Sequence, residues 1–362
     1  VRPSYVLGGR GMAIVYDDSD LITYMESATH VTPDRPVYLD AFLEDAIELD
    51  VDALCDTEEC YVGSVLEHIE ECGIHSGDSA CCWPPFSLSE KIVDQIRAIT
   101  KKLALACGIR GLLNIQYAVR DEHVFVIELN PRASRTVPFS SKATGVSLAK
   151  YASRIMAGEK ISELRAQGLL PDENRTVDYY AVKEAVMPWS RFPGADSILG
   201  PEMKSTGEVM GIARTFPAAY AKTREAVENK LPEQGSVFIS VCDRDKRAIA
   251  PVAMALENLG YGIYTTGGTA KTLRAAGIDC TTVNRISDGH PNVVDLMRDK
   301  TVSFIINTPH GHEAHSDGTK MRAEAVSQGI TCVTAMSAAT ALIQALAAAR
   351  KSEPETFALQ DL

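Results

Sequence analysis

The sequence predicts two folded regions of different class: an α+β region with an antiparallel sheet, and then a doubly wound α/β region with a parallel sheet. In the first half, strand-like runs outnumber helical ones, and two of them flank a short polar stretch, which is typical of a hairpin. In the last third, five apolar runs alternate strictly with helical segments, which is typical of parallel strands joined by crossover helices. Between the two patterns, a stretch rich in Gly and Pro predicts a connection.

The predicted boundaries follow these changes of pattern. We expect the first region over residues 1–190, a helical and Pro/Gly-rich connecting segment over 191–234, and the second region over 235–362. Two or three domains suit a chain of 362 residues. Because the chain opens with Val and a strand-like run, we expect it to be a piece of a longer protein.

Within the first region, residues 36–56 predict two strands, the second of which carries Glu48, Asp50 and Asp52 on one face. Residues 89–108 have apolar side chains at helical spacing and predict a helix. In the second region, the predicted strands cover 237–241, 261–266, 280–283, 302–307 and 332–335. The predicted helices lie near 245–259, 269–276, 292–298, 318–328 and 338–350.

Composition excludes several classes of protein. The net charge of −12 argues against a nucleic-acid partner, and no apolar run is long enough to span a membrane. The opening residues lack the pattern of a secretion signal. The nine Cys residues include no C-x-x-C pair, so we expect a reduced cytosolic protein rather than a disulfide scaffold, a zinc cluster or a cysteine enzyme.

The predicted hairpin offers a metal site. A turn centred near Glu122 would pair Gln116 with Glu128 and Asn114 with Asn130, which puts these polar side chains on one face. Oxygen donors carrying little formal charge suit Mg²⁺ or Mn²⁺ that is shared with phosphates. The alternative is an ordinary sheet with one solvent-facing polar face.

Neighbouring stretches fit the same chemistry. Arg132 and Arg135 follow the hairpin directly, and guanidinium groups there could bind phosphate oxygens or offset developing charge. A Gly-rich turn over 4–12 could cover phosphates with backbone N–H groups, although it has no Walker pattern and could be a plain hairpin turn. The loop "GIHSGDSACC", residues 73–82, could present polar groups to a substrate or could simply be a turn.

In the second region, the run Thr265-Thr266-Gly267-Gly268-Thr269 opens a predicted helix and could bind an anion there. The alternative is an ordinary helix cap. Further polar residues fall at predicted strand ends or helix starts, where doubly wound sheets bind ligands: Lys246, Arg285, Asn307 and Thr308.

Three histidines form H-x-H-x-x-H: His310, His312 and His315. The spacing allows zinc binding, but the run also follows a predicted strand end where phosphate loops sit, and local His clusters are often solvated.

Four stretches together resemble the large chain of carbamoyl phosphate synthase: "VRPSYVLGGRGM", "EHIEECGIHSGDSACCWPPFSLS", "NIQYAVRDEHVFVIELNPRASRTVPFSSKATGVSLAKYASRIMAGE" and "GPEMKSTGEVMG". The resemblance covers almost all of residues 1–225, and the part after 235 resembles the family's methylglyoxal-synthase-like regulatory domain. It implies the later part of the second ATP-grasp half, which phosphorylates carbamate with ATP. Because the first half and the opening lobe of the second would be missing, we expect the isolated chain not to make carbamoyl phosphate.

The resemblance implies roles for individual residues. Metal binding falls to Gln116, Glu128 and Asn130, and catalysis to Arg135 together with Glu128 and Asn130. ATP binding involves Arg2, Leu43, Glu48, Ile74, His75, Ser76, Gln116, Glu128 and Arg135. Nucleotide effectors, UMP and IMP, correspond to Lys246, Thr266, Thr269, Arg285 and Asn307, and ornithine to Glu70, Asp78 and Glu184. Departures from the family's pattern are Ala41, Arg285 and Pro309, where relatives have His, Lys and Thr.

The resemblance also implies partners and cofactors. These are a glutaminase small chain, the missing N-terminal part of the large chain, ATP, and Mg²⁺ or Mn²⁺ with K⁺ possible, in an assembly that can be oligomeric. Methylglyoxal synthase and the cyclohydrolase domain of purine biosynthesis resemble only the second region, and neither explains residues 1–225. A non-enzymatic alternative is a nucleotide-sensing fragment with an incomplete ATP site.

Overall fold

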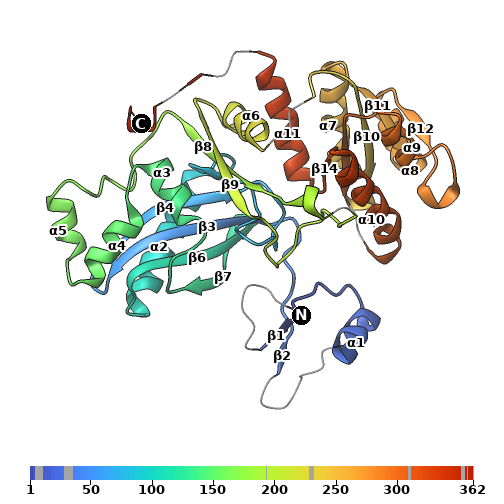
Figure 1. The fold of residues 1–362 in the computed structure, drawn as a ribbon. Helices are drawn as coiled ribbons and strands as arrows, with labels where there is room; N and C mark the ends of the chain where they lie inside the picture. The colour runs from blue at the N-terminus through green and yellow to red at the C-terminus, as the bar shows by residue number, and fades with distance from the viewer. Residues whose placement is uncertain are drawn as a thin grey trace.

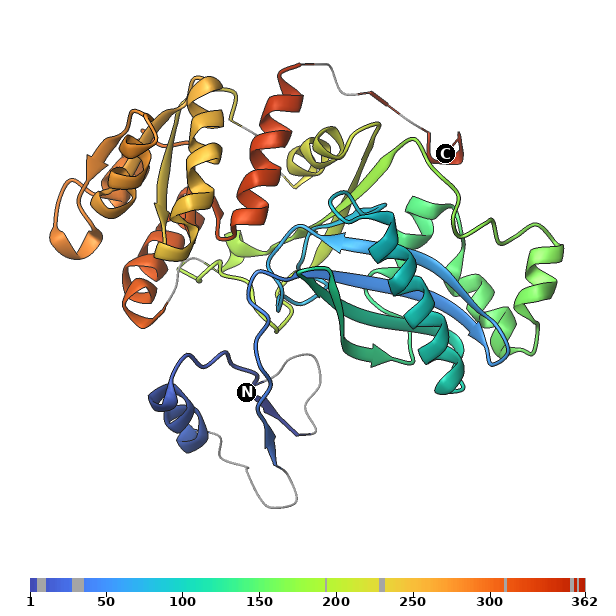
Figure 2. The same ribbon diagram turned by 180° about the vertical axis from the view of Figure 1, so that it is seen from behind.

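The computed structural model describes residues 1–4, 11–27, 36–192, 194–227, 232–308, 311–351, 355–356 and 358–361. Figures 1 and 2 show two main sheets next to each other and a small N-terminal section that extends away from them. That section holds an antiparallel two-stranded sheet and one helix: β1 (Arg2–Pro3), β2 (Val37–Tyr38) and α1 (Asp18–Ser27).

The larger sheet has seven antiparallel strands in the order β7-β6-β3-β4-β5-β8-β9. Its strands are β3 (Ile47–Asp56), β4 (Cys60–His68), β5 (Cys81–Trp83), β6 (Arg110–Arg120), β7 (His123–Asn130), β8 (Tyr180–Val186) and β9 (Gly207–Ala213). Its helices are α2 (Glu90–Ala106), α3 (Val137–Thr144), α4 (Leu148–Met156), α5 (Ile161–Ala166) and α6 (Phe216–Ala226).

The predicted helix after residue 89 is confirmed as α2, which covers one face of this sheet. Its apolar stripe, including Ile92 and Ile96, packs against Val51 and Ile115 in one hydrophobic core. The helix ends where Gly108 takes a left-handed conformation (φ 61°), which a glycine adopts without strain. One face of β3 and β6 is therefore apolar and covered, which leaves their polar residues on the other face.

The predicted hairpin is also confirmed, with a different turn. The turn residues are Asp121 and Glu122, both with positive φ (50° and 61°), as in a two-residue type I′ turn. A register shift next to Gln116 leaves Ile127 as an extra residue, so that Gln116 still pairs with Glu128. The turn is centred between Asp121 and Glu122, half a residue before the position expected from the sequence. The extra residue Ile127 compensates for this shift, so the expected pairs still form.

The second sheet confirms the predicted doubly wound region. Five parallel strands run in the order β12-β11-β10-β13-β14: β10 (Ser236–Val241), β11 (Gly262–Thr266), β12 (Thr281–Val283), β13 (Phe304–Thr308) and β14 (Thr331–Val333). The helices are α7 (Lys246–Asn258), α8 (Gly267–Ala275), α9 (Val293–Arg298), α10 (Gly311–Gln328) and α11 (Met336–Ala349). Short 3-10 turns are η1 (Trp189–Arg191), η2 (Asp243–Asp245), η3 (Ile286–Asp288) and η4 (Leu359–Asp361).

The segment 191–234 is more than the connection we expected. β9 pairs with β8 as the last strand of the larger sheet, and α6 packs on it. The small residues of α11, such as Ala338 and Ala341, share a core with Phe216 and Tyr220 of α6, and Figure 1 shows these helices side by side between the sheets. The Gly- and Pro-rich composition therefore marks a long loop before an edge strand, and not a domain boundary.

None of the helices in the described part of the chain is both long enough and apolar enough to cross a membrane.

Candidate functional site

Two polar rows cross the face of the larger sheet that lies opposite α2 and is partly covered by α3 and α4. Strand pairing places Asp50, Gln116 and Glu128 opposite one another on β3, β6 and β7. One step along, Asp52, Asn114 and Asn130 form a second row. Directly paired residues of an antiparallel sheet point to the same face, so all six side chains share it.

Exposure increases along each row toward the sheet edge. Asp50 and Asp52 on β3 are fully buried (0%), while Glu128 on β7 is exposed. The amide of Asn130 donates to the Glu128 carboxylate at 2.7 Å, so these two side chains converge. Polar oxygens are therefore accessible at the β7 end, where a bound cation could be reached from solvent.

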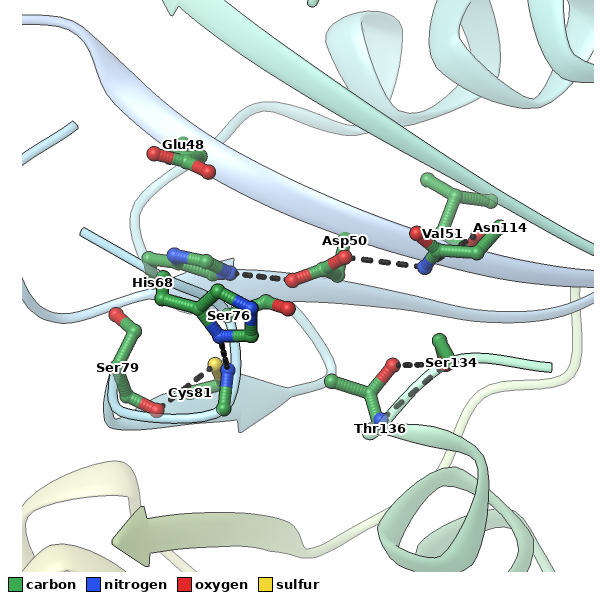
Figure 3. A network of polar contacts seen from close by, with 12 residues as sticks. Glu48, Asp50, Val51, His68, Ser76, Ser79, Cys81, Asn114, Ser134 and Thr136 are labelled. Atoms are coloured by element: carbon green, nitrogen blue, oxygen red, sulfur yellow. Dashed lines mark hydrogen bonds and ion pairs between the residues drawn. The ribbon is translucent and has the colours of Figure 1, made fainter. Parts of the chain in front are cut away.

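The buried end of the rows is held by an ion pair. His68 Nε2 lies 2.8 Å from Asp50 Oδ2, and Asn114 donates to Asp50 Oδ1 at 3.0 Å (Figure 3). Burial alone would raise the pKa of Asp50, but the hydrogen bond and charge of His68 outweigh it and lower that pKa. Burial would also lower the pKa of His68, yet Cys81 and Asp50 raise it well above its ordinary value. Both shifts favour the charged form of the group concerned.

The loop over residues 73–79 lies against this face and is fixed at both ends. The N–H of Gly73 donates to Glu48 Oε2 at 2.8 Å, and the buried ammonium of Lys183 donates to the carbonyl of Ser76 at 2.9 Å. The His75 N–H donates to the carbonyl of Gly200 at 2.8 Å. Burial of Glu48 raises its pKa.

The charge of Arg135 acts on the same loop. Burial lowers the pKa of His75, and the positive charges of Arg135 and Lys183 act in the same direction. Arg135 itself is exposed, at the start of the chain that leads into α3. The exposed guanidinium is therefore accessible to an anion.

Other predicted nucleotide residues lie outside this cluster. Arg2 is on β1, paired with Asp40 at 3.2 Å and stacked over the ring of Tyr38. Leu43 is half-buried in the stretch between β2 and β3. The Gly-rich turn falls mainly on residues 5–10, which are outside the described residues.

At the parallel sheet, predicted effector residues gather at the carboxyl ends of the strands. The Thr269 hydroxyl accepts the N–H of Val241 at 3.3 Å, and the Asn307 amide donates to the carbonyl of Ser240 at 2.9 Å. A Cβ atom on Gly268 would lie 3.6 Å from Lys246 Nζ, so the lysine reaches the Thr-Thr-Gly-Gly-Thr turn. This edge combines a cation, hydroxyls and a helix start, which is a suitable arrangement for an anion.

Thr266 belongs to this edge, since its hydroxyl lies 3.3 Å from that of Ser240. Arg285 is exposed after the end of β12, two strands away from β10. His310 lies outside the described residues, as do the side chains of His312 and His315, so the zinc hypothesis stays a prediction.

The three acidic residues expected to bind ornithine divide into two places. Burial and the charge of Glu184 raise the pKa of Glu70 to about 7. Glu184 accepts from Thr223 at 2.9 Å and pairs with Arg224. Asp78 instead accepts the N–H groups of Lys204 and Ser205 at 2.7 and 2.9 Å.

Comparisons with known proteins give one match in the region of each main sheet. Residues 1–164 match the family described as the carbamoyl-phosphate synthase L chain, ATP binding domain, and residues 248–334 match the MGS-like domain. This chain belongs to the family of carbamoyl phosphate synthase large chains. The polar rows, Arg135 and the 73–79 loop all lie within the ATP-binding match, and most of the effector residues lie within the MGS-like match.

Carbamoyl phosphate synthase large chains from several bacteria align with the whole chain. The Renibacterium salmoninarum protein is 49% identical, and those of Micrococcus luteus and Corynebacterium glutamicum are each 50% identical. The alignments cover 100% of this chain but only 34–35% of those proteins, so the chain spans about a third of the relatives' length. The biotin carboxylase domain of Hydrogenobacter thermophilus 2-oxoglutarate carboxylase is 18% identical, with 63% of this chain and 55% of that domain covered and a TM-score of 0.47. Shape similarity of that size is too low to assign a fold.

Several residues of this synthase-family chain were not singled out from the sequence. His68 and Lys183 contact the polar face, yet their partners are 18 and 107 residues away in the chain. A usable signal was present for Lys183, which together with Glu184 interrupts the otherwise apolar stretch "YYAVKEAV", residues 179–186. His68 carried no comparable signal.

The predicted metal ligands differ in chemistry from a cluster of acidic or thiol side chains. In the described part of the chain no group of three His, Cys, Asp or Glu side chains is placed to hold a metal ion. The predicted metal set differs from such a group because it has only one carboxylate, Glu128, and two amides, Gln116 and Asn130. Such oxygen donors fit Mg²⁺ or Mn²⁺ when phosphates and water supply the remaining ligands.

Proposed function

We propose that the polar face of the larger sheet, opposite α2, binds ATP with Mg²⁺ or Mn²⁺ and phosphorylates carbamate to carbamoyl phosphate, as part of a glutamine-dependent carbamoyl phosphate synthase. The supporting observation is the row of Asp50, Gln116 and Glu128 beside the row of Asp52, Asn114 and Asn130, inside the stretch that matches the ATP-binding domain. A surface that only faced solvent would not need a buried carboxylate, Asp50, paired with a buried histidine, His68.

The metal would be held by Gln116, Glu128 and Asn130 at the exposed end of these rows. When bound, it would offset the negative charge of the phosphates. The bulge at Ile127 supports this role, because without it Glu128 would point to the opposite face from Gln116.

The arginines would act on the phosphates. Arg135 lies beside the loop that holds His75, and Arg2 would reach the phosphates from the N-terminal section. Glu48, Leu43 and the 74–76 loop would form the nucleotide side of the pocket. Positioning and charge stabilisation are the main needs of phosphoryl transfer, so these residues would do little covalent work.

Carbamate decomposes in water, so its formation and use would have to take place in protected sites. We therefore propose that a glutaminase small chain and the upstream part of the large chain are partners, in the cytosol. Without that upstream part, the chain would bind ligands but not make carbamoyl phosphate.

The carboxyl edge of the parallel sheet would bind nucleotide effectors such as UMP and IMP through Lys246, Thr266, Thr269, Arg285 and Asn307. Ornithine would bind near Glu70 and Glu184, where two acidic groups approach each other, and near Asp78, which belongs to the 73–79 loop. A second candidate function is that of a nucleotide-sensing section that does not itself catalyse. It is favoured because all five residues proposed to bind nucleotide effectors are present in this chain.

The partial reaction tests the proposal. In the complete large chain with its small chain, ATP formation from carbamoyl phosphate and ADP should fall strongly in Glu128→Ala. Glu122→Ala is the matched control, because this glutamate is on the same hairpin with a largely exposed side chain. Equal rates in the two variants would contradict the metal role. Calorimetry of this chain with UMP, IMP, ornithine and Mg·ATP separates the candidates, since sensing alone requires effector binding without ATP binding.

A further inference from the structure

One buried carboxylate on the polar face accepts four hydrogen bonds, all from neutral groups. Asp52 is fully buried (0%) on β3. Its Oδ1 accepts from Ser134 Oγ at 2.6 Å and Asn114 Nδ2 at 3.1 Å, and its Oδ2 from Thr136 Oγ1 at 2.7 Å and Ser140 Oγ at 2.9 Å. Burial raises the pKa of Asp52, and the hydrogen bonds from Ser134, Thr136 and Ser140 oppose that rise. A buried carboxyl group needs such partners, so these donors are constrained to their places.

Two of the four donors are the residues on either side of Arg135. Ser134 and Thr136 are bonded to different oxygens of Asp52, and their own hydroxyls lie 2.8 Å apart (Figure 3). The N–H of Thr136 donates back to Ser134 Oγ at 3.2 Å. The backbone that carries Arg135 is therefore clamped to the sheet at both neighbours.

The same carboxylate is tied to the metal end of the face. Asn114, the third donor, pairs with Asn130 and also donates to Asp50 at 3.0 Å. Asp52 thus links the chain that carries Arg135 to the two strands that carry the predicted metal ligands. Hydroxyl and amide donors have directional bonds, so the link fixes an orientation as well as a distance.

We propose that Asp52 is a positioning residue for phosphoryl transfer: through Ser134 and Thr136 it holds Arg135 at a fixed place beside the metal ligands and the His75 loop. The proposal rests on the proposed function, in which Arg135 binds phosphate. Asp52 does not touch the nucleotide in this account.

A purely structural role would be to anchor the start of α3. Ser140 offers a matched control, since it is buried, donates to the same carboxylate oxygen as Thr136, and lies in α3 away from Arg135. If Asp52 only anchors the helix, then removing the hydroxyl of Thr136 and removing that of Ser140 should have the same effect on ligand binding. If it positions Arg135, then only the flanking hydroxyls should matter.

The affinity of this chain for a non-hydrolysable ATP analogue with Mg²⁺ is the first measurement. Thr136→Val should weaken it about fivefold and Arg135→Gln about tenfold or more, while Ser140→Ala should change it less than about twofold. In the Arg135→Gln background, Thr136→Val should cause no further loss, because both changes act through one guanidinium. Thermal unfolding of each variant shows whether the stability losses of Thr136→Val and Ser140→Ala are matched. Equal losses of affinity in these two variants, or additive losses in the double variant, would overturn the proposal.

A second measurement needs no nucleotide. The charge of Arg135 contributes to the lowered pKa of His75. In NMR titrations, Arg135→Gln and Thr136→Val should both move the His75 pKa upward, and Ser140→Ala should leave it in place. An unmoved His75 pKa in Thr136→Val, with a moved one in Arg135→Gln, would refute the positioning role. If the wild-type chain binds no ATP analogue, the proposed function fails for this chain and the titration alone decides the positioning role.

Discussion

The two sheets of this chain place polar side chains for ligands in different ways. In the seven-stranded antiparallel sheet, they lie across the face, in rows made by strand pairing, with fully buried charges at one end. In the five-stranded parallel sheet, they lie at the carboxyl edge, where strands end and helices begin. A site on a face depends on register, and a site at an edge depends on topology. We therefore expect changes at the buried end of the first site to affect stability, changes at its exposed end to affect chemistry, and changes at the second site to affect binding alone.

The largest effect should come from Glu128. In the complete synthase, Glu128→Gln should lower the rate of ATP formation from carbamoyl phosphate about a hundredfold or more, because it weakens charge neutralisation at the phosphates. Its exposed side chain makes no buried contact, so urea unfolding of the chain should hardly change. A rate within about threefold of the wild-type rate would contradict a role for this face of the sheet in phosphoryl transfer.

The buried pair beneath the face should matter most for stability. His68→Ala should lower the free energy of unfolding by about 3–5 kcal/mol, since it leaves Asp50 buried without its partner. The exposed pair of Lys91 and Glu122, 3.8 Å apart, is the control and should contribute about 0–1 kcal/mol.

The same pair should show a defined pH window. The raised pKa of His68 adds stability that is complete below the ordinary value of 6.5 and is lost as pH rises through the folded-state pKa. The lowered pKa of Asp50 adds stability that is complete above 3.8 and is lost as pH falls through its folded-state pKa. The stability difference between wild type and His68→Ala should therefore be greatest between these two ordinary values. A difference that is flat from pH 4 to 9 would contradict the ion pair.

Glu70 lies where the two regions meet, since its neighbour Arg224 also contacts Thr331 of β14 at 3.4 Å. Its pKa is raised from 4.5 to about 7, so the folded state binds an extra proton between these values. Stability should fall as pH rises across that range, and Glu70→Gln should restore up to about 3 kcal/mol at pH 8 and little at pH 4. Urea unfolding at both pH values checks the sign, and a variant that is less stable at pH 8 would contradict it.

At the edge of the parallel sheet, Lys246→Ala should weaken UMP binding about tenfold by calorimetry, since one charge-assisted contact to phosphate is lost. The melting temperature should stay unchanged, because the ion pair of Lys246 with Asp243 is largely exposed. Lys271→Ala on the exposed side of α8 is the control. If Lys246→Ala lowered the stability as much as His68→Ala does, the two sites would not differ in the way described.

The smallest effect concerns the hairpin turn. Glu122 has φ 61°, a conformation that glycine adopts more easily, so Glu122→Gly should raise the free energy of unfolding by about 0.5–1 kcal/mol. A destabilised variant would show that the turn, and with it the register of the metal ligands, differs from the one described.

Sequence reasoning succeeded where local pattern decides structure. Periodicity located α2 and the strand–helix alternation of the second sheet, and the pairing of Gln116 with Glu128 followed from the polar stretch between two strands. It did not locate the turn, because Asp121 and Glu122 are not the Asn-Gly type that marks a type I′ turn, and a bulge cannot be read from alternation.

The rest of the site depended on long-range contacts. Asp52 meets Ser134 from 82 residues away, and Lys183 meets Ser76 from 107, so neither pair has a spacing that indicates it. β9 was missed as a strand of the first sheet because the Gly- and Pro-rich loop before it has the composition of a linker. Sequence pattern alone does not identify side chains that are far apart in the chain and meet only in the folded protein.

Anomalous scattering from Mn²⁺, in crystals of this chain grown with the ion and a non-hydrolysable ATP analogue, tests the metal site most directly. We expect a peak within coordination distance of side-chain oxygens of Gln116 and Glu128, next to the phosphates of the analogue. A bound analogue whose Mn²⁺ peak lies away from both side chains would contradict it.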